Sequence, residues 1–356
     1  MKTKLWMLAL ILLSIYSCIE VDPFVDLQVS PTASPLESAN IISQKSKSEI
    51  NELIESQTYF DACVALVGNK VIYEYGDKNI PYNCASVRKS IFSALYGIAE
   101  GKGLVNLDAT LGELGINDSI NPLTETEKTA TLRHLLQARS GIYLPASGES
   151  AGMIRRKPAR GKYLPGEHFY YNNWDFNALP IILERITGKK IGEIIYEWLA
   201  IPTGMRDFMP ENVAYQYVDY TEYPQTRVYI SAEDLARFGS LYLTQGKWNN
   251  TQVIPAEWIE NSVKAVSHES RDADLLEHPF MEAYAYLWWV DEDTNTFWAD
   301  GAGGHFCIVD KTKNLVVVVR NNTGMSSAGY LFYNSQNPYE PNETGDKVYQ
   351  AIKSKF

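Results

Sequence analysis

Residues 83–92 read Asn-Cys-Ala-Ser-Val-Arg-Lys-Ser-Ile-Phe and place Ser86 three positions before Lys89. An apolar stretch with helical spacing follows and ends at Gly101 and Gly103, so a helix is predicted from about residue 86. Ser-x-x-Lys occurs about once by chance in a chain of this length, and a helix-capping serine beside a solvated lysine is the alternative interpretation. The function of the motif therefore depends on the rest of the chain.

The predicted helix start gives this pair a chemical rationale. Free backbone N–H groups and the helix dipole at that position stabilise negative charge that develops on Ser86. The apolar flanks remove water from the ammonium of Lys89, which lowers its pKa and lets the amine act as a base. The spacing predicts a nucleophilic serine that is activated by a lysine.

Composition excludes several classes of protein. The chain of 356 residues is 45% hydrophobic and 12% aromatic, which is ample for a packed core. Its formal net charge is −11 and it has no basic stripe with interleaved aromatic residues, so we expect no nucleic-acid partner. Five scattered histidines, without a CxxC or HExxH motif, argue against a metal site, and no cofactor is implied.

The first 18 residues are typical of an export signal. Residues 1–4 are basic, and residues 5–16 form an apolar run that is too short to span a membrane. The run ends in Ser17-Cys18, which resembles a bacterial lipobox, where a peptidase cuts before a cysteine that then carries lipid. We expect a lipoprotein of the bacterial cell envelope, on the periplasmic side or the cell surface, with its membrane anchor on Cys18. Ordinary secretion is the alternative.

The rest of the chain divides into a tether and one domain. Residues 19–45 are rich in Ser, Pro, Asp and Asn and predict a flexible tether, so the domain covers 46–356. Two β-rich pairs, at 62–76 and 304–322, surround polar turns and predict hairpins. We expect an α+β fold, in which one antiparallel sheet from both ends of the domain is flanked by helices, with an all-helical lobe inserted at roughly 86–220.

Helical patterns and isolated cysteines complete this outline. Helices are predicted at residues 47–56, 131–141, 177–199 and 231–243, the last with a capping pattern of Ser231 and Asp234. If Cys18 carries lipid, the remaining three cysteines form no disulfide framework and are interpreted as small buried apolar residues: Cys63, Cys84 and Cys307.

Two further segments contain residues suited to acyl transfer. Tyr171 and Asn173 form a Tyr-x-Asn triplet before a predicted helix, where a tyrosine near a lysine can manage a proton and an asparagine can bind a substrate amide or hold Lys89. Residues 301–304, Gly-Ala-Gly-Gly, precede a predicted strand and allow a substrate to approach the backbone N–H groups. An ordinary interface tyrosine and a strand bend are the alternatives.

In the order Ser-x-x-Lys, Tyr-x-Asn and Gly-rich strand, the chain resembles the serine β-lactamase and penicillin-binding-protein superfamily. The resemblance covers nearly all residues after about Ile50 and includes "TLRHLLQARSGI", "PGEHFYYNN", "ISAEDLARFGSLYLTQGKW", "VIPAEWI" and "YAYLWWV". These phrases are most similar to the class C β-lactamase-related branch of esterases and 6-aminohexanoate-dimer hydrolases. The resemblance implies a β-lactamase-like fold with the active site in the cleft between its two lobes.

The resemblance also implies roles for individual residues. Ser86 matches the nucleophile, Lys89 its activating partner and Tyr171 the general base and acid. Asn173 matches the end of the second triplet, and the backbone N–H groups of Ser86 and Gly304 match the oxyanion hole. The Gly-rich run supplies the remaining residues expected beside the substrate, Gly301 and Gly303.

One departure from the family pattern bears on the substrate. β-Lactamases and peptidases of this superfamily place Lys or His at the start of the third motif, where this chain has Gly301. The missing cation favours carboxylic esters or small amides over β-lactams and peptides. A β-lactamase or D-alanyl-D-alanine peptidase, and a sensor that is acylated without turnover, are the alternatives. The segment 153–162, with five basic residues, is a candidate border of the cleft or a solvated surface loop.

Overall fold

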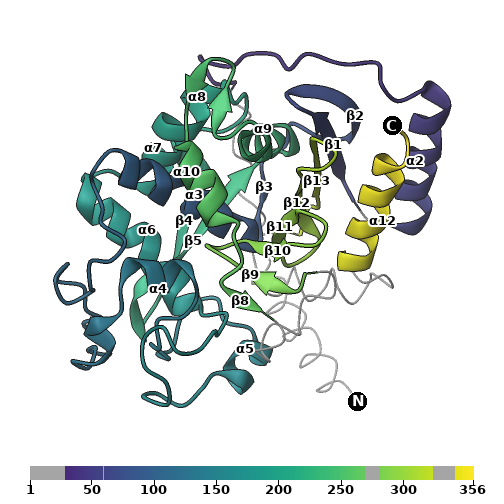
Figure 1. Ribbon diagram of the computed structural model, residues 1–356. Coiled ribbons are helices and arrows are strands. Elements are labelled where there is room, and N and C mark those ends of the chain that lie inside the picture. The colour runs from purple at the N-terminus through teal and green to yellow at the C-terminus, as the bar shows by residue number, and fades with distance from the viewer. Residues whose placement is uncertain (1–28, 59, 269–280, 324–340) are drawn as a thin grey trace, which may run out of the picture.

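The computed structural model describes residues 29–58, 60–268, 281–323 and 341–356 (Figure 1). The predicted signal peptide, the lipidation residue Cys18 and the first part of the predicted tether lie outside the described residues. Within the described ranges, no helix combines the length and the apolar character that a membrane span requires.

An antiparallel sheet built from both ends of the domain forms the centre of the fold, as predicted. Strand β1 pairs with β13 from Ala62 opposite Arg320 to Val67 opposite Leu315. All six residues of β13 are buried, which explains its run of valines in place of an alternating pattern. The strands of the eight-stranded sheet, in spatial order, are β2 (Lys70–Gly76), β1 (Ala62–Val67), β13 (Leu315–Arg320), β12 (His305–Asp310), β11 (Thr296–Gly301), β10 (Trp289–Asp291), β9 (Ala283–Tyr284) and β8 (Ser267–His268).

Helices cover both faces of this sheet. Helix α9 (Ala232–Leu243) packs on β12, β13 and β1, and its Gly239 lies so close to Cys307 that a Cβ there would be 2.7 Å from the sulfur. Helices α2 (Gln44–Gln57) and α12 (Pro341–Lys353), from the two ends of the chain, lie side by side next to the sheet (Figure 1). Cys63, Cys84 and Cys307 are buried free thiols, which confirms their interpretation from the sequence.

The inserted lobe is mostly helical, but it also carries a small sheet that the sequence did not predict. Its three strands are β3 (Tyr82–Asn83), β5 (Thr221–Ile230) and β4 (Val213–Val218), in that spatial order. The lobe and its surroundings contain η1 (Ala85–Val87), α3 (Arg88–Gly101), η2 (Glu127–Thr129), α4 (Leu132–Leu136), α5 (Ala151–Arg156), α6 (Asn173–Thr187), α7 (Ile191–Ile195), η3 (Tyr196–Ala200), α8 (Ile201–Thr203) and η4 (Pro210–Asn212). Strands β6 (Lys247–Trp248) and β7 (Thr251–Gln252) and helix α10 (Ala256–Ser262) follow α9.

The prediction of a flexible tether over 19–45 is wrong for the part that the structure describes. Ser30 N donates to Arg206 O at 2.7 Å, and Ala39 N donates to Val71 O at 2.8 Å beside the edge strand β2. The buried guanidinium of Arg237 donates to the carbonyl of Ser34 at 2.6 Å. The low hydrophobicity of this segment does not prevent docking, because its backbone groups supply the hydrogen bonds.

Candidate active site

The predicted nucleophile lies on a tight turn between β3 and α3. Ser86 belongs to the 3₁₀ turn η1, and the α-helix begins two residues later than predicted, at Arg88. The preceding residue, Ala85, has a φ of +46°, a left-handed conformation that costs a residue with a side chain about 1 kcal/mol or more. Ala85 N donates to Asn83 Oδ1 at 3.1 Å, and Cys84 N donates to Val228 O at 2.9 Å, so strand pairing holds the strained turn in place.

Ser86 and Lys89 are in direct contact. Lys89 Nζ donates to Ser86 Oγ at 2.6 Å, and the Lys89 side chain is buried. The same nitrogen lies 4.7 Å from the ring centre of Tyr171 and 4.9 Å from that of Phe176. Burial holds the pKa of Lys89 well below its ordinary value, and the positive charge of Arg88 lowers it further. The amine is thereby suited to accept a proton from Ser86.

The structure brings Tyr171 to the same place. Burial raises the pKa of Tyr171 above its ordinary range, and the nearby hydroxyl of Ser86 lowers it in part. The ring stacks on Trp289 with centres 5.6 Å apart and meets the edge of Tyr284 at 6.0 Å. These walls keep Tyr171 protonated at neutral pH and fix its orientation.

Asn173 makes a structural contact beside Tyr171, and the substrate contact predicted for it stays a prediction. Its side chain is buried, and Nδ2 donates to Gly148 O at 2.8 Å, so this amide holds the loop before α5 against α6. The middle residue of the triplet, Asn172, caps α6 through a bond from Trp174 N at 3.3 Å. The triplet thus supplies Tyr171 to the site and anchors the backbone on either side.

The Gly-rich run forms the end of β11 and the turn of a hairpin, immediately before strand β12 as predicted. It joins β11 to β12, with Gly301 opposite His305. Gly303 and Gly304 have φ values of +94° and +81°, which require glycine, and Asn321 Nδ2 donates to Gly303 O at 2.7 Å. Gly301 adjoins the nucleophile turn.

The position of Gly301 corrects the argument about a missing cation. A Cβ at residue 301 would lie 2.6 Å from Cys84 O and 3.2 Å from Val87 Cγ2, so no lysine or histidine fits there. The glycine is therefore explained by close packing of β11 on the nucleophile turn. Its lack of charge gives no information about the charge of the substrate.

Sequence analysis missed a carboxylate at the site. Asp300 precedes Gly301 at the end of β11 and is partly exposed. Its charge raises the pKa of both Lys89 and Tyr171, against the effect of Arg88 on each. No motif marks Asp300, Trp289 or Tyr284 as site residues, because only the folded sheet places them beside Ser86.

The basic segment 153–162 is largely committed to structural contacts. Arg160 forms two hydrogen bonds with the buried Glu127 carboxylate, at 2.8 and 2.6 Å. Lys157 lies 2.6 Å from Glu149 and also donates to Leu144 O. Both cations are thus paired with carboxylates of the same lobe, and the position of the segment at the border of the cleft stays a prediction.

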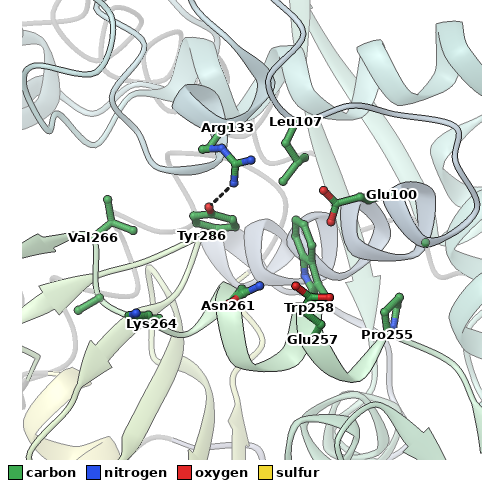
Figure 2. Close-up of a pocket in the computed structure, with 12 residues that line it drawn as sticks. Glu100, Leu107, Arg133, Pro255, Glu257, Trp258, Asn261, Lys264, Val266 and Tyr286 are labelled. Atoms are coloured by element: carbon green, nitrogen blue, oxygen red, sulfur yellow. Dashed lines mark hydrogen bonds between the residues drawn. The ribbon is translucent and has the colours of Figure 1, made fainter.

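A separate surface cavity of about 700 Å³ lies at the other end of α3 (Figure 2). Arg133 and Tyr286 point toward each other across it and are joined by a hydrogen bond of 2.8 Å. Glu100, in the last turn of α3, also lines the cavity, whereas Ser86 precedes the first turn. At 1.5 Å per residue these ends are about 20 Å apart, so the cavity is distinct from the candidate active site.

Comparisons with known proteins agree with this arrangement. The sequence model of the family described as Beta-lactamase matches residues 62–331. An uncharacterized protein of Alkalihalophilus pseudofirmus is 25% identical over 226 residues, which cover 59% of this chain and 61% of that protein. The match thus spans less than two thirds of the length of this curated relative.

Solved structures share the fold at low sequence identity. A candidate 6-aminohexanoate-dimer hydrolase from Bacillus anthracis has a TM-score of 0.63 and 20% identity and covers 95% of this chain and 94% of that chain. A candidate β-lactamase from Bacteroides dorei has a TM-score of 0.63 and 17% identity, with 88% and 98% covered. A penicillin-binding-protein homolog from Caulobacter crescentus has a TM-score of 0.63 and 11% identity, with 91% and 99% covered.

Proposed function

This chain belongs to the β-lactamase family, within the superfamily of serine β-lactamases and penicillin-binding proteins, and on that premise we propose that it cleaves carboxylic esters or small amides through an acyl-enzyme on Ser86. The observation that carries the proposal is the 2.6 Å contact between Lys89 Nζ and Ser86 Oγ, made by a buried lysine whose pKa is lowered. A solvated lysine beside a capping serine would show neither feature.

The proposed reaction begins with proton transfer from Ser86 to Lys89. A neutral amine has a lone pair as well as N–H donors, so rotation of the serine hydroxyl reverses the direction of the observed hydrogen bond. Ser86 Oγ then attacks the carbonyl carbon, and backbone N–H groups of the Ser86 turn and the adjoining β11 end stabilise the oxyanion. Tyr171 donates a proton to the leaving group and recovers one from Lys89. Water, deprotonated by the same pair, attacks the acyl carbon, and the pair returns the proton to Ser86 Oγ as the acyl group leaves.

Asp300 supports the preference for neutral substrates. Its carboxylate lies at the end of the strand that adjoins the nucleophile turn, and its charge is felt by both Lys89 and Tyr171. A substrate carboxylate close to the reacting carbonyl would be repelled by this group. β-Lactams and carboxyl-terminal peptides carry such a carboxylate, whereas simple esters and linear amides do not. β-Lactam hydrolysis remains the second candidate function because the matching family model is that of β-lactamases.

The proposal is tested with purified wild type and Ser86→Ala on aryl esters, linear amides and β-lactams. We expect hydrolysis of a neutral ester or amide by wild type and a loss of about 10³-fold or more in kcat for Ser86→Ala. The fold should be retained, because the change removes only a hydroxyl group from the 3₁₀ turn η1. Near-normal turnover by Ser86→Ala would refute Ser86 as the nucleophile. With a fluorescent penicillin, rapid labelling and release would instead indicate a β-lactamase, and stable labelling a sensor.

The role of Asp300 has its own measurement in this assay. A neutral ester is compared with its carboxylate-bearing analogue on wild type and Asp300→Asn at low and high salt. We expect Asp300→Asn to improve kcat/KM for the anionic analogue by several-fold at low salt and to leave the neutral ester within about twofold. Equal effects on both substrates would show that Asp300 does not set the charge preference.

We also propose that the protein acts in the bacterial cell envelope as a lipoprotein, anchored to a membrane through Cys18. The support is the basic start, the short apolar run and the Ser17-Cys18 junction.

A further inference from the structure

Arg88 is a buried cation that has no carboxylate partner in the described part of the chain. Its side chain is 3% exposed, and Nη1 donates to Ala85 O at 2.5 Å. Nε and Nη2 have no hydrogen-bond partner among the described residues. A buried guanidinium that is left this poorly paired destabilises a fold by several kcal/mol compared with an apolar side chain of the same size. Such a cost at a site of catalysis calls for a function.

The surroundings of Arg88 show which groups its charge affects. It lowers the pKa of Lys89, its neighbour along α3, and that of Tyr171. Three charged or titratable groups act on Arg88: the Cys84 thiol, the Tyr171 phenol and the guanidinium of Arg227 on β5. None of these three groups is a carboxylate, and in a region of low dielectric the charge of Arg88 acts strongly on its neighbours.

The side-chain hydrogen bond of Arg88 points to a second effect. It ends on the carbonyl of Ala85, the residue with the strained left-handed conformation immediately before Ser86. Without that bond, the turn loses the side chain that spans it from the first residue of α3. Arg88 therefore contacts the turn that carries Ser86 and also places a positive charge near the proposed base, Lys89.

We propose that Arg88 is a positioning residue that holds the Ala85–Ser86 turn and, through its unpaired charge, keeps Lys89 a free amine that can accept the serine proton. The proposal rests on the proposed function and extends it. Arg88 keeps its own protons throughout: the Ser86 proton moves to the Lys89 lone pair as the bond from Oγ to the carbonyl carbon forms. The opposing influence on Lys89 is the Asp300 carboxylate from β11, with a smaller one from the Cys84 thiol.

The test is the pH dependence of kcat/KM on a neutral aryl ester for Arg88→Met, Arg88→Lys and Arg155→Met. Arg155 is exposed on α5 and controls for the loss of one positive charge. We expect Arg88→Met to move the ascending limb of the profile to higher pH by about one unit. Its kcat/KM should fall about tenfold or more at pH 7, and part of that activity should return at high pH. Arg88→Lys should keep the limb near its wild-type position with a lower plateau, and Arg155→Met should match wild type.

Stability distinguishes a functional arginine from a structural one. Removal of an unpaired buried charge should leave the thermal midpoint of Arg88→Met unchanged or a few degrees higher. The proposal is overturned if the ascending limb of the Arg88→Met profile stays in place, whether kcat/KM falls equally at every pH or does not fall. It is also overturned if the thermal midpoint of Arg88→Met falls by several degrees.

The outcome is separable from failure of the proposed function. If wild type and Ser86→Ala behave alike on every substrate, the hydrolase assignment fails while Lys89 can still be titrated directly. For this, the side-chain carbon next to Nζ is followed by NMR against pH in wild type and Arg88→Met, with Lys89→Met to assign the signal. A higher pKa for Lys89 in Arg88→Met supports the charge effect, and an unchanged one overturns it.

Discussion

At the scale of single residues, burial shifts the two proton-carrying side chains in opposite directions. Desolvation disfavours whichever form is charged, so it lowers the pKa of the Lys89 amine and raises that of the Tyr171 phenol. Burial therefore favours the uncharged form of both groups. The sequence left open which of them first accepts the proton of Ser86, and this distribution favours Lys89 as base and Tyr171 as proton donor.

The pH profile should reveal this assignment. The amine is active when deprotonated, and its pKa is lowered from the ordinary value of 10.5. We therefore expect kcat/KM on a neutral ester to rise once as pH increases through that lowered pKa and to stay level into the alkaline range, since the pKa of Tyr171 is raised. If activity first appears only where a tyrosine ionises, above about pH 10, the phenolate rather than the amine is the base.

Variants of the pair provide an independent check. Lys89→Met and Tyr171→Phe should each reduce kcat by about 10²-fold or more. The kcat of the double variant should be close to that of the less active single variant, because both groups transfer the same proton. The ascending limb should persist in Tyr171→Phe and vanish in Lys89→Met. Losses that simply multiply would show that the two side chains act independently.

At the scale of elements, the contact of β11 with the nucleophile turn is decisive. Gly301→Ala would place a Cβ 2.6 Å from Cys84 O, so the turn that carries Ser86 must shift. We expect a loss of about 10²-fold in kcat, because a displacement near 1 Å at the reacting atoms has an effect of that size. Gly112→Ala, whose Cβ meets ordinary contacts at 3.4 Å, is the matched control. Similar kinetics for both variants would contradict the close-packing explanation.

Helix α9 gives a second prediction at this scale. Ser231 caps the helix by accepting from Asp234 N at 3.2 Å, but the Asp234 carboxylate does not return the bond as a capping box would. It instead accepts from the backbone N–H groups of Arg206, Asp207 and Phe208, at 2.7, 2.8 and 2.9 Å. The aspartate thereby ties α9 to the end of the helical lobe.

Asp234→Asn should test this tie. The amide would turn an NH₂ group toward a backbone N–H, and we expect the free energy of unfolding to fall by about 1–3 kcal/mol, measured by chemical denaturation. Asp219→Asn, an exposed aspartate next to the turn between β4 and β5, should change it by less than about 0.5 kcal/mol. Equal stabilities of the two variants would mean that the three bonds contribute nothing.

At the scale of the whole molecule, the docked segment near the N-terminus limits the distance from the proposed anchor to the domain. Ser30 is already bonded to Arg206, so only residues 19–29 separate Cys18 from the folded domain. At about 3.3–3.6 Å per residue this length reaches at most roughly 40 Å. The proposed anchor would therefore keep the active-site lobe close to the membrane.

Cys18→Ala should release the protein from the membrane fraction. The reason is that the lipidated cysteine is the proposed anchor, and the readout is fractionation together with mass spectrometry of the native N-terminus. The variant Cys63→Ala, at a buried thiol in β1, controls for general loss of a cysteine and should stay in the membrane fraction. An unmodified mature chain that begins at another residue would refute the anchor.

The sequence by itself determined the local features of this protein. Ser86 and Lys89 meet because a spacing of three residues brings side chains together on one helical turn. The hairpins at both ends of the domain followed from short apolar runs around polar turns, and the family resemblance followed from the motif order. These features depend on neighbours along the chain, so local patterns were sufficient to predict them.

Only the tertiary structure decided which distant residues complete the site. Trp289 and Asp300 come from strands β10 and β11, and no local pattern records that β11 lies against the turn of Ser86. The tertiary structure alone also explains the glycine at residue 301 and the pKa shifts of Lys89 and Tyr171. Close approach and desolvation arise from the packing of segments that are far apart in the chain, and packing is a property of the assembled fold.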